Sequence, residues 1–258
     1  MNAPLTPNPK WGDLPARLGS AVVMVIVGAT AIWLGGIWFL ALMAIVVSAM
    51  VWELVTMLDP ALSTGRRLGL GISAGVMLVA TAWGGLLPML LIPTILGAVL
   101  ISKDRALYAS YCLAIMLACF CLYALRDLRG INWVIWLVGV VVITDIAGYF
   151  VGRLLGGPKF WPRISPKKTW SGTAGGWLGA AMFGYYLSGV DFAIFSVLVA
   201  FASQLGDIAE SAIKRRTGVK DSSNLIPGHG GFLDRFDGMI AAALLVWLVG
   251  ASIGLPGA

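Results

Sequence analysis

The sequence predicts an all-α, polytopic integral membrane helical bundle, and three observations support this fold class. Of the 258 residues, 59% are hydrophobic and only 12% are charged, and the mean hydropathy is +0.89. Soluble domains carry about 25% charged residues, and a core of this size cannot hide so much apolar surface from water. The apolar residues also form runs long enough to cross a bilayer. Because a backbone in lipid must satisfy its own hydrogen bonds, we expect helices in these runs.

About nine transmembrane helices result when the apolar runs are cut at charges, Gly-Pro clusters and turn residues. We expect residues 1–18 to form a cytoplasmic N-terminal tail and residues 19–258 to form a single transmembrane domain, because no repeat or linker divides the chain. The expected spans lie near residues 19–35, 37–57, 67–84, 86–102, 106–124, 131–152, 172–188, 191–213 and 236–255.

The basic residues indicate how the bundle is oriented. An odd number of spans puts the termini on opposite sides, and the long basic loops near 153–171 and 214–235 then share a side with the N-terminus. The opposite connections carry little charge, apart from the stretch with Arg126 and Arg129. The positive-inside rule therefore places the N-terminus and both loops in the cytoplasm. The two loops can converge there, so we expect them to be catalytic.

A polar face interrupts the cytoplasmic end of the eighth span. Carboxylates at membrane depth are costly unless they meet a cation or a partner. One interpretation is an internal salt bridge from Glu210 to Lys214. The other is a metal and phosphate site in which Asp207 supplies oxygen to the cation. Four residues at i, i+3, i+4 and i+7 share this face: Asp207, Glu210, Ser211 and Lys214.

The loop that follows is dense in groups that bind phosphate and hard cations. Asp234 and Asp237 are three residues apart, so both can project from the first turn of the last helix toward one point. Mg²⁺ prefers carboxylate oxygens beside the phosphates of a substrate. An isolated histidine is more often structural, but His229 stands in a polar loop, where we expect it to donate to phosphate. Three glycines would let backbone amides approach an anion closely: Gly228, Gly230 and Gly231.

The earlier loop carries a second polar group. Asp145 is an acid inside an apolar span, and such acids are functional candidates by default. Hydroxyl and ammonium groups stand just before the seventh span, where a helix N-terminus adds its own positive end to anion binding. The alternative is a positive-inside anchor that touches lipid headgroups. The candidates in this stretch are Arg153, Ser165, Lys167, Lys168 and Thr169.

Glu53 is the remaining unusual acid, near the cytoplasmic end of the second span. It could line a cavity for lipid, or it could be a structural residue that caps Arg66 or Arg67. The sequence leaves both roles open.

The stretch from Ser211 to Asp237 resembles the signature of phosphatidate cytidylyltransferases, also called CDP-diacylglycerol synthases. The stretch 144–172 resembles a second motif of this family, and the layout of the spans is similar. One departure is Ser171, at a position that is often acidic or an amide in the family, which leaves open any metal or nucleotide role there. The signature reads Ser211-x-Ile213-Lys214-Arg215, four residues, Lys220-Asp221, then Pro227-Gly228-His229-Gly230-Gly231 and Asp234-Arg235-Phe236-Asp237.

The resemblance implies an activity, the transfer of the cytidylyl group of CTP to phosphatidate in phospholipid biosynthesis, which gives CDP-diacylglycerol and pyrophosphate. The implied cofactor is Mg²⁺, and a second cation stays open. The implied catalytic residues are Asp207, Asp234, Asp237, Lys214 and Ser211, and the three aspartates would hold the metal. The implied contacts to the phosphates of CTP and phosphatidate are Ser165, Lys167, Lys168, Thr169, Arg153, Lys220, Asp221, His229 and Arg235. Secondary or structural roles fall to Asp145, Glu210, Gly228, Gly230 and Gly231.

Two other functions compete with this one. A membrane transporter fits the helices and the intramembrane acids, but it gives no reason for a Gly-His-Gly-Gly loop flanked by aspartates. A cytidylyltransferase or CTP-dependent kinase acting on another lipid is closer, and the kinase would release CDP. We expect no nucleic-acid partner, because its basic surface would have to be larger and free of lipid. We expect a multi-pass protein of the bacterial inner (plasma) membrane. The sequence leaves open the acyl-chain preference, the preference for CTP over dCTP, the number of metal ions and whether the protein forms a homodimer.

Overall fold

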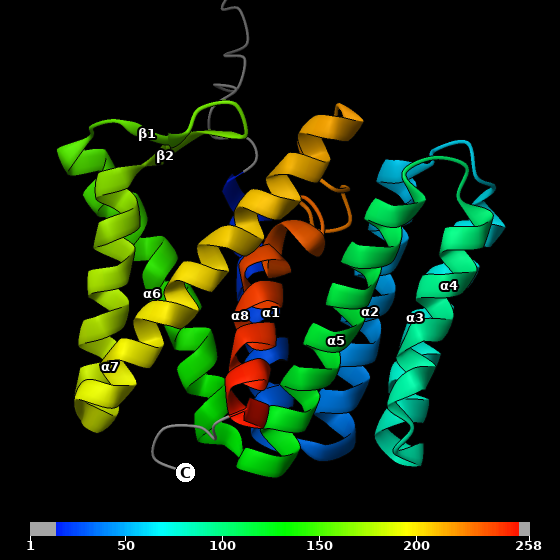
Figure 1. Cartoon of the computed structure of the whole chain (residues 1–258), viewed down its shortest axis with the longest axis horizontal. Coiled ribbons are helices and arrows are strands. Elements are labelled where there is room, and N and C mark those ends of the chain that lie inside the picture. The colour runs from blue at the N-terminus through cyan, green and yellow to red at the C-terminus, as the bar shows by residue number, and fades with distance from the viewer. Residues whose placement is uncertain (1–13, 253–258) are drawn as a thin grey trace, which may run out of the picture.

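The computed structural model describes residues 14–252, and helices account for most of them (Figure 1). Two short strands, β1 (Lys159–Trp161) and β2 (Ser165–Thr169), lie between α6 and α7. The helices in chain order are α1 (Leu14–Leu34), α2 (Gly36–Leu58), α3 (Thr64–Gly84), the 3₁₀ turn η1 (Leu87–Leu90), α4 (Leu91–Leu100), α5 (Arg105–Arg129), α6 (Ile131–Leu155), α7 (Trp170–Thr217) and α8 (Leu233–Ser252).

Seven helices in the described part of the chain are long and apolar enough to cross a membrane, which confirms the predicted membrane helical bundle. Two regions differ from the expected spans. The span near 86–102 corresponds to a shorter apolar helix over Leu87–Leu100. The spans near 172–188 and 191–213 both lie in α7, which has 48 residues and leaves the helical conformation at Ser188 and Gly189. The number of nine crossings therefore stays a prediction.

The long helix α7 connects the two sides of the bundle (Figure 1). Its first half runs beside α6, and after the turn its second half crosses the bundle diagonally toward the opposite side (Figure 1). The turn depends on Gly189, whose φ of 80° lies in the left-handed region that glycine adopts without a steric penalty. The diagonal half then packs against α8.

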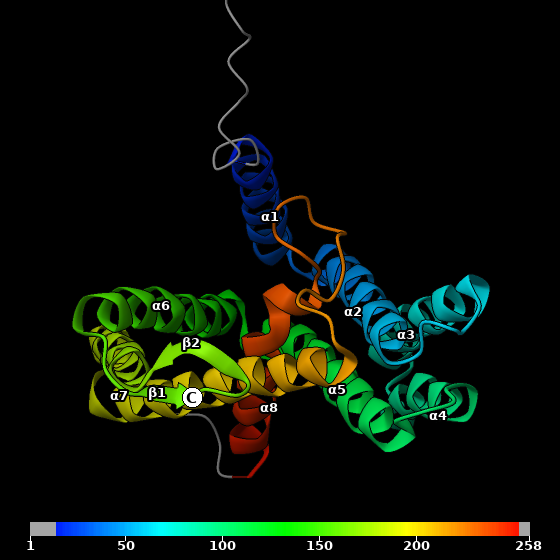
Figure 2. The same cartoon turned by 90° about the horizontal axis from the view of Figure 1, so that it is seen from above.

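The helices α2, α5 and α8 lie in the middle of the bundle, with α6 and α7 on one side and α3 and α4 on the other (Figure 2). Side chains of α2 such as Val47, Val51 and Leu54 are fully buried and form part of the core. The outer faces are apolar and exposed, as for Val25 on α1 with 69% exposure. Such surfaces are unfavourable in water but are normal for helices that face lipid.

The hairpin of β1 and β2 was not predicted. The strands are antiparallel, with Lys159 opposite Thr169 and Trp161 opposite Ser165. The requirement for helices holds only inside lipid, and Pro162 and Pro166 disfavour a helix in this loop. The hairpin lies at the same end of the bundle as the loop between α7 and α8 (Figure 1). The two basic loops therefore do share one end of the molecule.

Candidate active site

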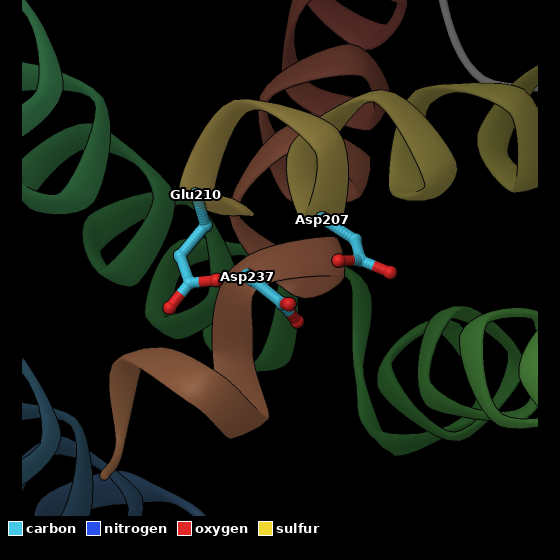
Figure 3. A group of neighbouring side chains, drawn as sticks. All are labelled: Asp207, Glu210 and Asp237. Atoms are coloured by element: carbon cyan, nitrogen blue, oxygen red, sulfur yellow. The ribbon is translucent and has the colours of Figure 1, made fainter. Parts of the chain in front are cut away.

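Three carboxylates meet where the second half of α7 crosses the start of α8. Asp207 and Glu210 project from α7, and Asp237 projects from α8 (Figure 3). One carboxylate oxygen from each residue lies within 4.8 Å of the other two. The close crossing depends on Gly206, because a Cβ atom there would collide with the carbonyl oxygen of Asp237. We call Asp207, Glu210 and Asp237 the open acids.

The open acids receive few hydrogen bonds from the protein. Glu210 is completely buried, and no neutral donor among the described residues contacts either of its oxygens. It pairs with the Lys214 ammonium at 2.5 Å. Asp237 accepts from the amide of the next residue, Gly238, at 2.7 Å. Clustered carboxylates repel each other and are costly to desolvate. Since Mg²⁺ binds through carboxylate oxygens, this cluster fits a divalent cation.

Asp207 joins this cluster to the hairpin. Its carboxylate forms an ion pair with Lys168, which is on β2. It also accepts from the Ser211 hydroxyl at 3.2 Å, one helical turn further along α7. The side chain of Asp207 is 31% exposed, whereas that of Glu210 is fully buried. The cluster therefore reaches from a fully buried position to a partly exposed one.

Asp234, which was also predicted to bind metal, lies outside this cluster. Its Oδ2 accepts from the Ser222 amide, the Ser222 hydroxyl and the Gly231 amide, each at 2.8 Å. Its Oδ1 accepts from Lys214 Nζ at 2.6 Å. Protein donors thus contact both oxygens, and Lys214 stands between Asp234 and Glu210. Metal ligation by Asp234 stays a prediction, and it would require Lys214 to move.

Glu53 holds the same loop from the opposite side. It is fully buried on α2 and accepts four hydrogen bonds from the loop and the start of α8. Its partners are therefore neither Arg66 nor Arg67. We call Glu53 and Asp234 the loop-binding acids. The donors to Glu53 are the hydroxyls of Ser222 (3.2 Å) and Ser223 (2.6 Å) and the amides of Phe232 (2.9 Å) and Leu233 (2.7 Å).

The loop-binding acids explain two of the three signature glycines. A Cβ on Gly230 would lie 2.7 Å from Asp234 Oδ2, and Gly230 has a φ of +82°. A Cβ on Gly231 would overlap the Glu53 carboxylate and the Ser222 hydroxyl. The sequence predicted that these glycines let amides approach an anion. In the structure, the amides near these glycines bind the protein's own carboxylates.

His229 and Gly228 face α1. The His229 Nδ1 atom and the Ser20 hydroxyl are 2.8 Å apart, and that hydroxyl also contacts the Pro227 carbonyl oxygen at 2.8 Å. A Cβ on Gly228 would collide with the side chain of Arg17. The histidine therefore connects the loop to the first helix. Its predicted contact with phosphate stays a prediction.

A cavity of about 510 Å³ opens beside Asp207, between α6, the hairpin and the first half of α7. This volume is within the range for small-molecule sites. Its wall includes Gln204, whose side-chain oxygen accepts from the Trp177 indole at 2.9 Å. Four basic side chains line the cavity with one acid, so it suits an anionic ligand. The charged lining residues are Asp145, Arg153, Lys159, Lys167 and Lys168.

The end of β2 fixes the hairpin onto α7. Thr169 caps α7, and its hydroxyl accepts from the Gly172 amide at 3.2 Å. Ser171, the residue that departs from the family pattern, donates to the carbonyl oxygen of Gly156 at the end of α6. The hydroxyl thus holds the two ends of the hairpin loop together.

Comparison with known proteins identifies the family. A sequence model of the cytidylyltransferase family matches residues 15–253. The chain belongs to this family. The phosphatidate cytidylyltransferase of Brucella suis biovar 1 (strain 1330) is 34% identical over 259 residues, which cover 95% of this chain and 96% of the relative. That of Mycobacterium tuberculosis is 36% identical over 151 residues, covering 55% of this chain and 46% of the relative. That of Staphylococcus saprophyticus is 37% identical over 157 residues, covering 55% and 60%.

In this member of the cytidylyltransferase family, the structure gathers most of the predicted residues at two places and leaves the others apart. The α7–α8 crossing holds Asp207, Ser211, Lys214, Asp234 and Asp237, and Glu210 joins them. The cavity holds Asp145, Arg153, Lys167, Lys168 and Thr169. Arg235 is exposed, but it lies close enough to Asp145 of the cavity wall for their charges to interact. The remaining predicted phosphate ligands are not brought to either place by a described contact: Ser165 in the hairpin, His229 against α1, and Lys220 and Asp221 at the surface.

One candidate site residue of this cytidylyltransferase, Tyr111, was not predicted from the sequence. The hydroxyl of Tyr111 on α5 is buried without a hydrogen-bond partner among the described residues. It lies close enough to all three open acids to interact electrostatically with their carboxylates. A tyrosine in an apolar helix gives little signal of this kind, because aromatic residues are common in cores. Only the packing of α5 near α7 and α8 reveals it.

Proposed function

We propose that this chain transfers the cytidylyl group of CTP to phosphatidate and releases pyrophosphate. The observation that carries this proposal is the juxtaposition of three open acids and a basic cavity at the end of the bundle. One substrate comes from water and the other from the bilayer, so a site at helix ends beside polar loops suits both. Membership of the family and the names of the relatives support the same activity.

The main electrostatic obstacle is that both substrates are polyanions. Arg153, Lys167 and Lys168 line the cavity and would attract the phosphates of CTP. Lys214, near the cluster of acids, would add positive charge in a partly dehydrated place, where charge interactions are stronger than in water. The lipid phosphate is ionised at neutral pH, so its oxygen can attack the α-phosphorus while the bond to pyrophosphate breaks. No protein nucleophile is needed.

The open acids would hold the cation in this proposal. Bound Mg²⁺ neutralises phosphate oxygens and stabilises the leaving group in reactions of this class. Asp207 and Asp237 would approach it from two helices, and Glu210 would complete the carboxylate set. Lys214 would be held by Glu210 and Asp234, and so kept beside the cation. A direct bond from Asp234 to the cation is the alternative arrangement.

The topology is part of the same proposal. We place the N-terminus, the hairpin and the α7–α8 loop in the cytoplasm, because CTP is a cytosolic compound and the basic residues gather at that end. The two halves of α7 and the Leu87–Leu100 segment would then count as separate crossings, giving nine in a single domain. The membrane would be the bacterial inner membrane, since the relatives named above are bacterial.

The direct test is an assay of the purified protein in mixed micelles. It uses phosphatidate and CTP labelled on the α-phosphate, with Mg²⁺ or with a chelator. We expect the label to enter the lipid fraction together with an equal amount of pyrophosphate, and only with Mg²⁺. Release of CDP instead would indicate a kinase. Absence of any lipid-dependent turnover would contradict the proposal.

A further inference from the structure

We propose that Glu53 is a positioning residue, which fixes the α7–α8 loop and the first turn of α8 so that Asp237 meets the other two open acids. The inference rests on the proposed function for its kinetic consequence. The contacts themselves do not depend on that function. Glu53 touches none of the open acids in any described contact, so it would act through the loop.

The first step is that Glu53 provides a fixed anchor. It lies on the middle helix α2, among Met50, Val51 and Leu54, which are fully buried. Four donors from residues 222–233 converge on its two oxygens at 2.6–3.2 Å. Loops have few contacts of their own and open more easily than the core. A loop that is hydrogen-bonded to a carboxylate in the core is therefore held in a fixed position relative to the core.

The second step concerns the start of α8. The first amides of a helix have no partner inside the helix, and they carry partial positive charge. In α8 the Leu233 amide and the preceding Phe232 amide donate to Glu53. Glu53 therefore caps α8 from another helix, which sets where α8 begins. Asp237 follows one turn later, so its position over α7 depends on that start.

The third step is that Glu53 is connected to the cluster of acids through a chain of contacts. The Ser222 hydroxyl lies 3.2 Å from Glu53 and 2.8 Å from Asp234. A hydroxyl has one proton to donate, so the two loop-binding acids share it. Asp234 then binds Lys214, and Lys214 binds Glu210. Movement of the loop away from Glu53 would pass along this chain to an open acid.

Glutamine is the most informative substitution for Glu53, because it has nearly the same shape but accepts fewer hydrogen bonds. All four partners of Glu53 donate hydrogen, and a glutamine side chain has only one oxygen to accept. Its amide nitrogen must therefore face donors. The variant Glu53→Gln keeps the volume of the core and disrupts the contacts with the loop.

Asp59 offers a matched control on the same helix. It is a buried acid at the end of α2 that accepts from the Ser102 amide at 2.9 Å and from the Ser102 hydroxyl at 2.7 Å. These bonds lower the pKa of Asp59 below its ordinary value. Asp59→Asn thus disrupts a comparable tether between α2 and another loop, which touches the signature only through the exposed side chain of Arg216, paired with Asp104.

The experiment compares wild type, Glu53→Gln and Asp59→Asn by kinetics, thermal unfolding and amide hydrogen exchange. We expect Glu53→Gln to lower kcat at least tenfold, to leave KM for CTP within threefold, and to speed exchange in residues 222–237. We expect Asp59→Asn to unfold at a similar temperature and to keep wild-type kcat. Exchange needs no activity, so an inactive wild type would count against the proposed function alone.

Two results would overturn the inference. One is a kcat of Glu53→Gln within twofold of wild type. The other is unchanged exchange in residues 222–237. If Glu53→Gln does not fold, Ser223→Ala decides, because it removes the 2.6 Å contact with Glu53 and otherwise only a 3.1 Å contact from the Leu225 amide inside the loop. A two- to fivefold loss of kcat at unchanged unfolding temperature supports the positioning role, and wild-type kcat rejects it.

Discussion

The open acids and the loop-binding acids both surround the start of α8, but different groups contact their oxygens. Glu53 and Asp234 are surrounded by amides, hydroxyls and one ammonium group. Asp207, Glu210 and Asp237 face each other with few protein donors. A buried carboxylate without donors is costly. The first pair therefore holds the loop and the start of α8 in place, whereas Lys168 and Lys214 balance only part of the charge of the open acids, which could hold a cation.

The largest effect should come from an open acid. We expect Asp237→Asn to lower turnover at least ~100-fold, since even outer partners of a bound metal cost about 10–100-fold. Fold and unfolding temperature without Mg²⁺ should be retained, because the substitution removes repulsion between carboxylates. The measurement is turnover together with the rise in unfolding temperature caused by Mg²⁺. A variant that keeps this rise would not fit the assignment.

Asp234→Asn should separate the two groups of acids. We expect it to reduce turnover by about 10–100-fold, because an asparagine amide faces the donors of the loop and Lys214 loses a partner. In contrast to Asp237→Asn, it should still be stabilised by Mg²⁺. Titration of Mg²⁺ against unfolding temperature checks this difference. Loss of Mg²⁺ stabilisation in Asp234→Asn would instead make Asp234 a ligand and remove the distinction between the groups.

Lys168→Met tests the connection between the open acids and the cavity. Lys168 lines the cavity and pairs with Asp207. Loss of a charge-assisted phosphate contact costs about 1.5–3 kcal/mol, so we expect KM for CTP to rise by roughly tenfold or more, with a smaller change in kcat. Lys103→Met is the control, because it removes the same charge from an exposed loop outside the cavity. An equal rise of KM for CTP in the two variants would show that Lys168 contributes only to the overall positive charge of the surface.

The smallest effect is expected from Tyr111→Phe. The variant removes a buried hydroxyl that has no partner among the described residues, and such groups cost about 1–3 kcal/mol. The protein without Mg²⁺ should therefore be as stable as wild type or more stable. If the hydroxyl donates to a water molecule beside the cation, the stabilisation by Mg²⁺ should fall while kcat changes by about twofold. A clear loss of stability without Mg²⁺ would show that the hydroxyl has a structural partner.

The sequence was sufficient for features that depend on local pattern. Apolar runs predicted the helices because lipid leaves the backbone no other partner. The spacing of Asp207, Ser211 and Lys214 predicted their common face, which the contact from Ser211 to Asp207 confirms. The salt bridge from Glu210 to Lys214 was one of two interpretations, and the structure combines it with the cluster of acids.

Features that depend on distant packing could not be predicted. Asp234 and Asp237 look equivalent in the sequence, and only the capped start of α8 turns one toward the loop and the other toward α7. Glu53 gives no sign of its partners, which are about 170 residues away in the chain. The hairpin could not be predicted because its residues show neither the spacing of a helix face nor the clear alternation of polar and apolar residues that marks a strand.

The central claim is that the cation lies among Asp207, Glu210 and Asp237. The most direct measurement is an anomalous difference map from crystals of the protein grown with Mn²⁺ in place of Mg²⁺. We predict a peak within coordination distance of these three carboxylates, with Lys214 still paired with Asp234. A peak on Asp234, with Lys214 displaced and Glu210 or Asp237 uncoordinated, would contradict it.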